Sequence, residues 1–204
     1  TVALFGAGKI GEAISALLAS SGRYKVRVCD GDLARATAVA SQWNSCEAHQ
    51  LSLADPASMK ALLQGCSVVM SALPFACNKL VAQAAADVGV HYADLTEDVD
   101  TSHFIATLAT MSSVCFIPQC GIAPGFISIA AAHLVKLFDK VDTVKMRLGA
   151  LPIYPSNRLK YNLTWSTDGL INEYCNLCEA IVDGARREVL PLEGLEHFSL
   201  DGVR

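Results

Sequence analysis

The order of apolar and polar positions predicts alternating strands and helices in the first part of the chain. Short apolar runs alternate with stretches in which apolar residues recur three or four positions apart, which is helical spacing. The strand-like runs cover residues 1–5, 24–29, 48–53, 67–73, 91–95 and 114–118. The helical stretches cover residues 10–20, 33–43, 57–63, 78–88 and 101–110. This alternation indicates parallel strands joined by crossover helices, and so a doubly wound Rossmann sheet.

The pattern changes after residue 125. Helices are expected over residues 126–138 and 168–181, and alternating strands over 141–149 and 159–165. Two further short strands are expected near residues 188–192 and 197–203. We therefore expect residues 1–125 to form a Rossmann domain, and residues 126–204 to form a second, α+β substrate domain with an antiparallel sheet.

A glycine-rich motif joins the first predicted strand to the first predicted helix. In this context a G-x-G-x-x-G motif predicts a dinucleotide-binding turn. Its first glycine allows the tight turn, its second lets the pyrophosphate approach the backbone, and its third lets the helix pack closely. The phosphates would meet N–H groups at the positive end of the helix. The predicted cofactor turn consists of Gly6, Ala7, Gly8, Lys9, Ile10 and Gly11.

Two further segments complete the expected cofactor site. Asp30 ends the second predicted strand, 19 positions after Gly11, where its carboxylate can accept hydrogen bonds from ribose hydroxyls. A carboxylate there would repel a 2′-phosphate, so we expect NAD, while the nearby Arg27 and Arg35 leave NADP possible. The fourth strand leads into residues expected to line the nicotinamide, and Asn78 would reach the cofactor or cap a helix. The lining residues are Ala72, Leu73 and Pro74.

Several segments, spread over nearly the whole chain, carry a family resemblance. They are the glycine turn, Ser-Ala-Leu-Pro-Phe at 71–75, His-Tyr-Ala-Asp-Leu-Thr-Glu at 91–97, Pro-Gln-Cys-Gly-Ile-Ala-Pro-Gly at 118–125, and residues 159–174. Together they resemble the saccharopine dehydrogenase family, and the last segment is similar to its lysine 6-dehydrogenase-like branch. The resemblance implies an NAD(P)-dependent oxidoreductase acting on a C–N bond of a lysine-like amino acid. It also implies a longer substrate domain, so we expect the second domain to be incomplete here.

Candidate catalytic residues follow from position and from the resemblance. Glu97 and Asp98 come after the fifth strand, at the carboxyl edge where ligands bind in parallel sheets. A carboxylate there can accept a proton or hold an ammonium group; the alternative is a helix cap. The resemblance adds Tyr161 and Asn172 as catalytic candidates. Asp94 is expected to be a buried network residue.

The expected substrate-binding residues lie at two places in the chain. Cys120 ends the sixth strand, and the start of the next helix could bind a substrate carboxylate. The second place is the segment from Trp165 to Glu173, in which Ser166 or Thr167 could instead cap a helix. The full set is Cys120, Gly125, Phe126, Trp165, Ser166, Thr167 and Glu173.

Composition narrows the class of partner. The formal net charge is −4 without a basic stripe, and no apolar run has the length of a membrane span, so neither nucleic acid nor membrane is expected. Eight scattered cysteines are typical of a reducing, cytoplasmic protein, and the pair Cys175 and Cys178 lacks the further ligands that a metal needs. We expect a homodimer. Two alternatives stay open: a carboxynorspermidine synthase-like reductive condensation, and a non-catalytic dinucleotide-binding sensor.

Overall fold

A computed structural model describes residues 1–149, 152–154, 156–158, 161–163 and 167–197. The chain divides into two compact units, Thr1–Tyr161 and Asn162–Arg204. Helix α6 (Phe126–Val135), which the sequence pattern assigns to the second domain, belongs to the first of these units. A functional boundary at residue 125 stays a prediction.

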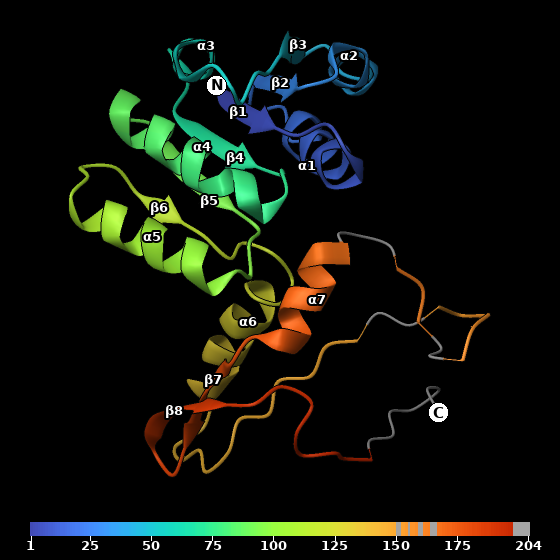
Figure 1. The fold of residues 1–204 in the computed structure, drawn as a ribbon, viewed down its shortest axis with the longest axis vertical. Helices are drawn as coiled ribbons and strands as arrows, with labels where there is room; N and C mark the ends of the chain where they lie inside the picture. Colours follow the sequence, from blue (N-terminus) through green and yellow to red (C-terminus); the bar gives the residue numbers. More distant parts are fainter. Residues whose placement is uncertain (150–151, 155, 159–160, 164–166, 198–204) are drawn as a thin grey trace. The chain divides into compact units, whose positions relative to one another are not determined.

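A parallel sheet of six strands forms the centre of the first unit (Figure 1). Its strands are β1 (Val2–Phe5), β2 (Val26–Asp30), β3 (Cys46–Gln50), β4 (Val68–Ser71), β5 (His91–Asp94) and β6 (Phe116–Ile117). They lie in the order β3-β2-β1-β4-β5-β6, which is the Rossmann order and confirms the expected fold class. Strands are added on one side of β1 up to β3 and on its other side from β4 onward, so the strand order reverses between β1 and β4. The crevice beyond the carboxyl ends of these two strands is the expected ligand site.

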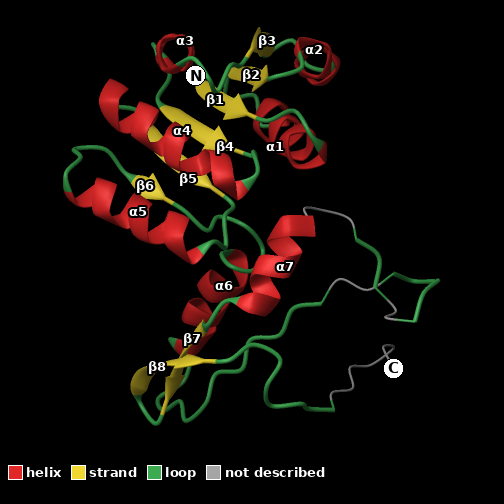
Figure 2. Cartoon of the chain, viewed as in Figure 1, coloured by secondary structure: helices red, strands yellow, loops and turns green. Residues whose placement is uncertain are grey.

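Helices cover both faces of this sheet (Figure 2). The first five are α1 (Lys9–Ser20), α2 (Leu33–Ala40), α3 (Pro56–Leu63), α4 (Phe75–Val88) and α5 (Val99–Thr110). Strand β1 shows why both layers form, because successive side chains point to opposite faces. Ala3 and Phe5 lie in a core cluster with residues of α3, α4 and α5, whereas Leu4 lies in another with residues of α2. A strand buried on both faces reads as a continuous apolar run.

The helices begin in two different ways. Aspartate side chains accept backbone N–H bonds at the start of α2, α3 and α5, and these caps are Asp32, Asp55 and Asp98. No side chain caps α1, whose N-cap residue is Gly8, or α4, whose N-cap residue is Pro74. These two helices follow β1 and β4, so their uncapped ends belong to the crevice of the sheet.

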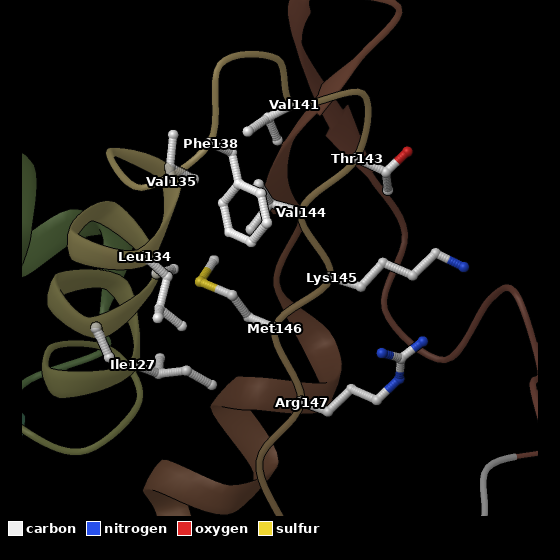
Figure 3. A pocket seen from close by; sticks show the side chains of 12 residues that line it. Ile127, Leu134, Val135, Phe138, Val141, Thr143, Val144, Lys145, Met146 and Arg147 are labelled. Atoms are coloured by element: carbon white, nitrogen blue, oxygen red, sulfur yellow. The ribbon is translucent and has the colours of Figure 1, made fainter.

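The segment after α6 differs from the prediction. Residues 141–149 form no strand in the structure, although Figure 3 shows Val144 and Met146 directed toward α6 and Lys145 and Arg147 directed away. The alternating pattern is therefore expressed as two sides of an extended segment, because no neighbouring strand pairs with it among the described residues. An apolar pocket of about 420 Å³ lies between this segment and α6.

The second unit contains α7 (Thr167–Cys175) and an antiparallel hairpin of β7 (Cys178–Val182) and β8 (Ala185–Val189). The hairpin confirms the antiparallel sheet, but the prediction that one helix runs to residue 181 is wrong. Asp183 and Gly184 join the strands with positive φ values of 53° and 74°, and Asp-Gly is a favoured hairpin turn. The strand expected near 188–192 ends at Val189.

Other expected elements fall partly outside the described residues. Of the strand expected over 159–165, only residues 161–163 are described, and they form no strand. Of the strand expected over 197–203, only His197 is described. Across the described ranges, no helix is long and apolar enough to cross a membrane.

Candidate functional site

In the glycine turn, two glycines are required by the protein backbone and one leaves space for a ligand. Gly6 has a φ of +105°, and an added Cβ would lie 2.8 Å from the carbonyl oxygen of Ala72. An added Cβ at Gly11 would lie 1.9 Å from the carbonyl oxygen of Gly6, so both glycines are required by the turn itself. At Gly8 an added Cβ meets nothing within 4 Å and φ is −79°. Open space beside the uncapped start of α1 fits the pyrophosphate of a dinucleotide.

Asp30 holds this turn in place. Its Oδ2 accepts a hydrogen bond from the backbone N–H of Ala7 at 2.7 Å, and its Oδ1 accepts one from Asp32 at 2.9 Å. An ionised carboxylate can accept about four hydrogen bonds, so two such bonds leave capacity for ribose hydroxyls. The sequence pattern indicated the ribose role but not the contact with the glycine turn.

Of the two arginines near Asp30 in sequence, Arg27 is engaged elsewhere, whereas Arg35 is an exposed residue beside Asp32. The Arg27 guanidinium donates to the carbonyl oxygens of Leu62, at 2.5 Å, and Gln64, at 3.2 Å. Arg35 lies on the first turn of α2, 3.9 Å from the carboxylate of Asp32. Arg27 is therefore held at the C-terminal end of α3 and is not directed by these contacts to a 2′-phosphate.

The segment after β4 lies against the glycine turn. The backbone N–H of Ala72 donates to the carbonyl oxygen of Phe5 at 2.7 Å, and an added Cβ at Gly6 would lie 3.4 Å from Leu73. Pro74 follows as the N-cap residue of α4. The structure thus brings two expected groups of cofactor residues together, from strands that are separated in sequence.

Asn78 lies deeper than expected. It is within α4 and is only 1% exposed, and its Oδ1 accepts a hydrogen bond from the Ser71 hydroxyl at 2.6 Å. It is not a helix cap, because α4 begins at Phe75. Its side chain fixes the end of β4 under the expected cofactor site, and direct contact with a cofactor stays a prediction.

A buried hydrogen-bond network closes the end of β5, as expected for Asp94. The Tyr92 hydroxyl donates to Asp94 Oδ2 at 2.6 Å, while Asp94 Oδ1 accepts from the backbone N–H groups of Thr96 and Gln119 at 3.0 and 3.2 Å. Burial raises the pKa of Asp94 against the opposing effect of these hydrogen bonds. The partner Gln119, whose φ is 61°, was not singled out by the sequence pattern.

Glu97 is the half-buried carboxyl group at this edge. Burial raises its pKa above the ordinary value of 4.5, and the negative charges of Asp98 and Asp94 also raise it. Asp98 is the helix cap that the sequence left as an alternative, since its Oδ2 accepts from Thr101 at 2.8 Å. Of the two carboxylates, Glu97 is therefore the candidate acid or base.

The loop after β6 contains three expected substrate residues. Cys120 is exposed, and desolvation of its thiol raises its pKa, as does Asp94, which makes Cys120 a lining residue rather than a nucleophile. Gly125 is the N-cap residue of α6, but the N–H groups of Phe126 and Ile127 donate to carbonyl oxygens of the loop itself. A substrate carboxylate would therefore compete with the loop for these donors.

The remaining candidates lie at the end of the first unit and in the second. Tyr161 exchanges hydrogen bonds with Asn157 through its backbone. Thr167, Asn172 and Glu173 are all on α7, where Asn172 Oδ1 accepts from the Asn176 side chain at 2.5 Å. Trp165 and Ser166 lie outside the described residues. Within the described ranges, no group of three His, Cys, Asp or Glu residues could hold a metal ion.

Comparison with known families assigns the first unit. A family model described as the saccharopine dehydrogenase NADP binding domain matches residues 2–147. The chain belongs to the saccharopine dehydrogenase family. This confirms the resemblance and an NAD(P) cofactor, which the glycine turn and the uncapped start of α1 can hold.

Solved structures support the fold assignment. Apo saccharopine dehydrogenase (L-Glu forming) from Saccharomyces cerevisiae is 22% identical with a TM-score of 0.67, over 93% of this chain and 44% of that one. UDP-N-acetylglucosamine 3-dehydrogenase from Acidithiobacillus ferrooxidans is 21% identical with a TM-score of 0.50, over 67% of this chain and 42% of that one. The chain thus spans less than half the length of either protein, and identities this low show the fold alone.

Proposed function

We propose that this protein is an NAD(P)-dependent oxidoreductase that acts on a C–N bond of a lysine-like amino acid, with NAD(H) as the preferred cofactor. The observation that carries the proposal is Glu97, a half-buried carboxyl group with a raised pKa at the carboxyl edge of a dinucleotide-binding sheet. In this family such a sheet binds NAD(P). A proton-accepting group at that edge is what amine oxidation requires.

The cofactor supplies the hydride acceptor or donor when bound. Backbone groups of the turn around Gly8 would bind its pyrophosphate, and Asp30 its adenosine ribose. Leu73 and Pro74 would exclude water beside the nicotinamide. The side chain at position 30 is a carboxylate and not a cation that could bind a 2′-phosphate, which favours NAD(H). The hydrogen bonding of Arg27 to α3 agrees with that preference.

Glu97 would accept a proton from the substrate ammonium group, because that nitrogen must lose its proton before the adjacent carbon can give up hydride. The raised pKa makes Glu97 a stronger base than an exposed glutamate. Residues of the loop from Cys120 to Phe126 would form one wall of the substrate site. By resemblance, Tyr161, Asn172 and Glu173 are further catalytic or substrate-binding candidates.

The test is a substrate screen with the full-length gene product, following the absorbance of the reduced nicotinamide. Turnover with lysine or saccharopine is the expected result, and turnover with polyamines instead would favour reductive condensation. Glu97→Gln should abolish turnover and leave NADH affinity nearly unchanged. Dinucleotide binding without turnover of any amino acid or polyamine would contradict the proposal. Homodimer formation and a cytoplasmic location stay predictions.

A further inference from the structure

Asp94 makes hydrogen bonds to three separate parts of the site. Its Oδ1 accepts from Thr96, which follows β5, and from Gln119, which is 25 positions later in the sequence. Its backbone carbonyl accepts from Cys120 at 2.7 Å, and its Oδ2 accepts from Tyr92 within β5. The side chain is 2% exposed, so these partners replace water.

The contact with Thr96 continues toward Glu97. The Thr96 hydroxyl accepts from the backbone N–H of Asp98 at 3.1 Å, and Asp98 caps α5. Glu97 therefore lies between two residues whose backbone N–H groups are fixed by this chain of hydrogen bonds. Loss of the first acceptor would free the backbone on one side of the candidate base.

The contact with Gln119 sets the loop on the other side. Gln119 has a φ of 61°, a left-handed conformation that is unfavourable for a residue with a side chain. The loop that follows is tight, because an added Cβ at Gly125 would lie 2.2 Å from the carbonyl oxygen of Gly121. A change of backbone angle at Gln119 would therefore move the whole loop up to the start of α6.

Burial of the Asp94 carboxylate costs free energy, because the group loses its hydration. Burial raises the pKa of Asp94, which means that the folded protein disfavours its charged form. No ion pair of Asp94 is found among the described residues to offset this. What the side chain provides is an acceptor oxygen placed between two backbone segments that are distant in sequence.

We propose that Asp94 is a positioning residue that holds Glu97 and the 119–125 loop in one fixed arrangement at the carboxyl edge of the sheet. The significance of that arrangement for catalysis rests on the proposed function. The test below needs neither cofactor nor substrate, so a failure of the proposed function and a failure of this inference are distinguishable.

Hydrogen–deuterium exchange followed by mass spectrometry measures the backbone directly. In Asp94→Ala the N–H groups of Thr96 and Gln119 lose their acceptor, which frees the two backbone segments that they anchor. Amides of residues 95–98 and 119–126 should therefore exchange about tenfold faster or more, while amides of β1 and β4 keep their rates. Asp94→Asn should stay near the wild type, because its carbonyl oxygen can still accept from Thr96 and Gln119. Tyr92→Phe is the matched control, since it removes only the Oδ2 donor.

A second substitution tests the left-handed turn. Adding Gln119→Gly to Asp94→Ala should restore protection over 120–126, because glycine adopts a positive φ without strain. It should not restore protection over 95–98 or at residue 119, because the Asp94 acceptor is still missing there. Unchanged exchange in Asp94→Ala would overturn the proposal, as would a uniform acceleration that Gln119→Gly does not correct. If Asp94→Ala gives no folded protein, Asp94→Glu decides, since it displaces the acceptor and should accelerate exchange in the same two segments. Wild-type exchange in Asp94→Glu would then refute the inference.

Discussion

Replacing Gly8 by alanine should weaken cofactor binding while sparing the fold. An added Cβ meets no atom within 4 Å, and the backbone φ of −79° suits any residue. Alanine is a poorer helix N-cap than glycine by about 0.5–1 kcal/mol. Its restriction of the unfolded chain offsets about 0.4–1 kcal/mol of that loss. We therefore expect the Tm to change by less than about 3 °C.

The dinucleotide should be affected far more than the protein. The methyl group would occupy the space through which the pyrophosphate approaches the start of α1. Loss of one hydrogen bond to a charged group costs about 1.5–3 kcal/mol, which corresponds to a Kd that is about 10- to 150-fold higher. Gly8→Val, with a branched side chain, should reduce binding below detection.

Fluorescence titration with NADH and thermal unfolding together test this reasoning. Gly149→Ala is the matched control, because an added Cβ there also meets nothing within 4 Å, and it should bind NADH normally. Gly11→Ala should lower the Tm strongly, since its Cβ would lie 1.9 Å from a backbone oxygen. If Gly8→Ala binds NADH as tightly as the wild type, or unfolds as early as Gly11→Ala, the assignment of the turn is refuted.

The remaining predictions concern carboxylates. Asp30→Asn should weaken NADH binding and relax discrimination against NADPH. Asp30→Ala should also destabilise the protein by about 1–3 kcal/mol, because the Ala7 N–H loses its acceptor. Binding of NADP(H) by the wild type that is about tenfold tighter than binding of NAD(H) would contradict the preference. The acid limb of kcat/KM should lie above the ordinary glutamate pKa of 4.5, and activity should fall as Glu97 is protonated. Asp98→Asn, which still caps α5, should move that limb to lower pH, and an unmoved limb would exclude Glu97 as its origin. The pKa of Asp94 is raised in the folded protein above its ordinary value of 3.8. The contribution of Asp94 to stability is therefore present below pH 3.8 and is lost as the pH rises through the folded pKa. Over that pH interval, thermal unfolding should show the wild type losing stability relative to Asp94→Asn.

The parallel sheet of the first unit could be predicted from the sequence because its signals are local. The glycine turn stands between a strand and a helix, and each strand is followed by a helix that must pack back on the same sheet. Right-handed crossovers then leave few possible arrangements. The end of β2 at Asp30 and the approach of Ala72 to Gly6 follow from that topology, because the carboxyl ends of parallel strands share one edge.

The second part of the chain shows what local pattern leaves open. Residues 141–149 alternate like a strand, yet a strand exists only where another segment pairs with it, and pairing is a tertiary property. The helix expected over 168–181 stops at Cys175 because residues from Cys178 onward pair with Ala185–Val189. The helical spacing gave no reason to stop there, although the Asp183-Gly184 turn was the available signal.

The chemistry of the site depended on the tertiary structure in the same way. The sequence alone determined that Glu97 and Asp98 follow β5, but only folding made one a helix cap and left the other half-buried with a raised pKa. Folding also placed Gln119 against Asp94, which is 25 positions earlier in the sequence. The desolvation of a carboxyl group and the acceptors it meets are set by segments distant in the chain, and no local pattern encodes them.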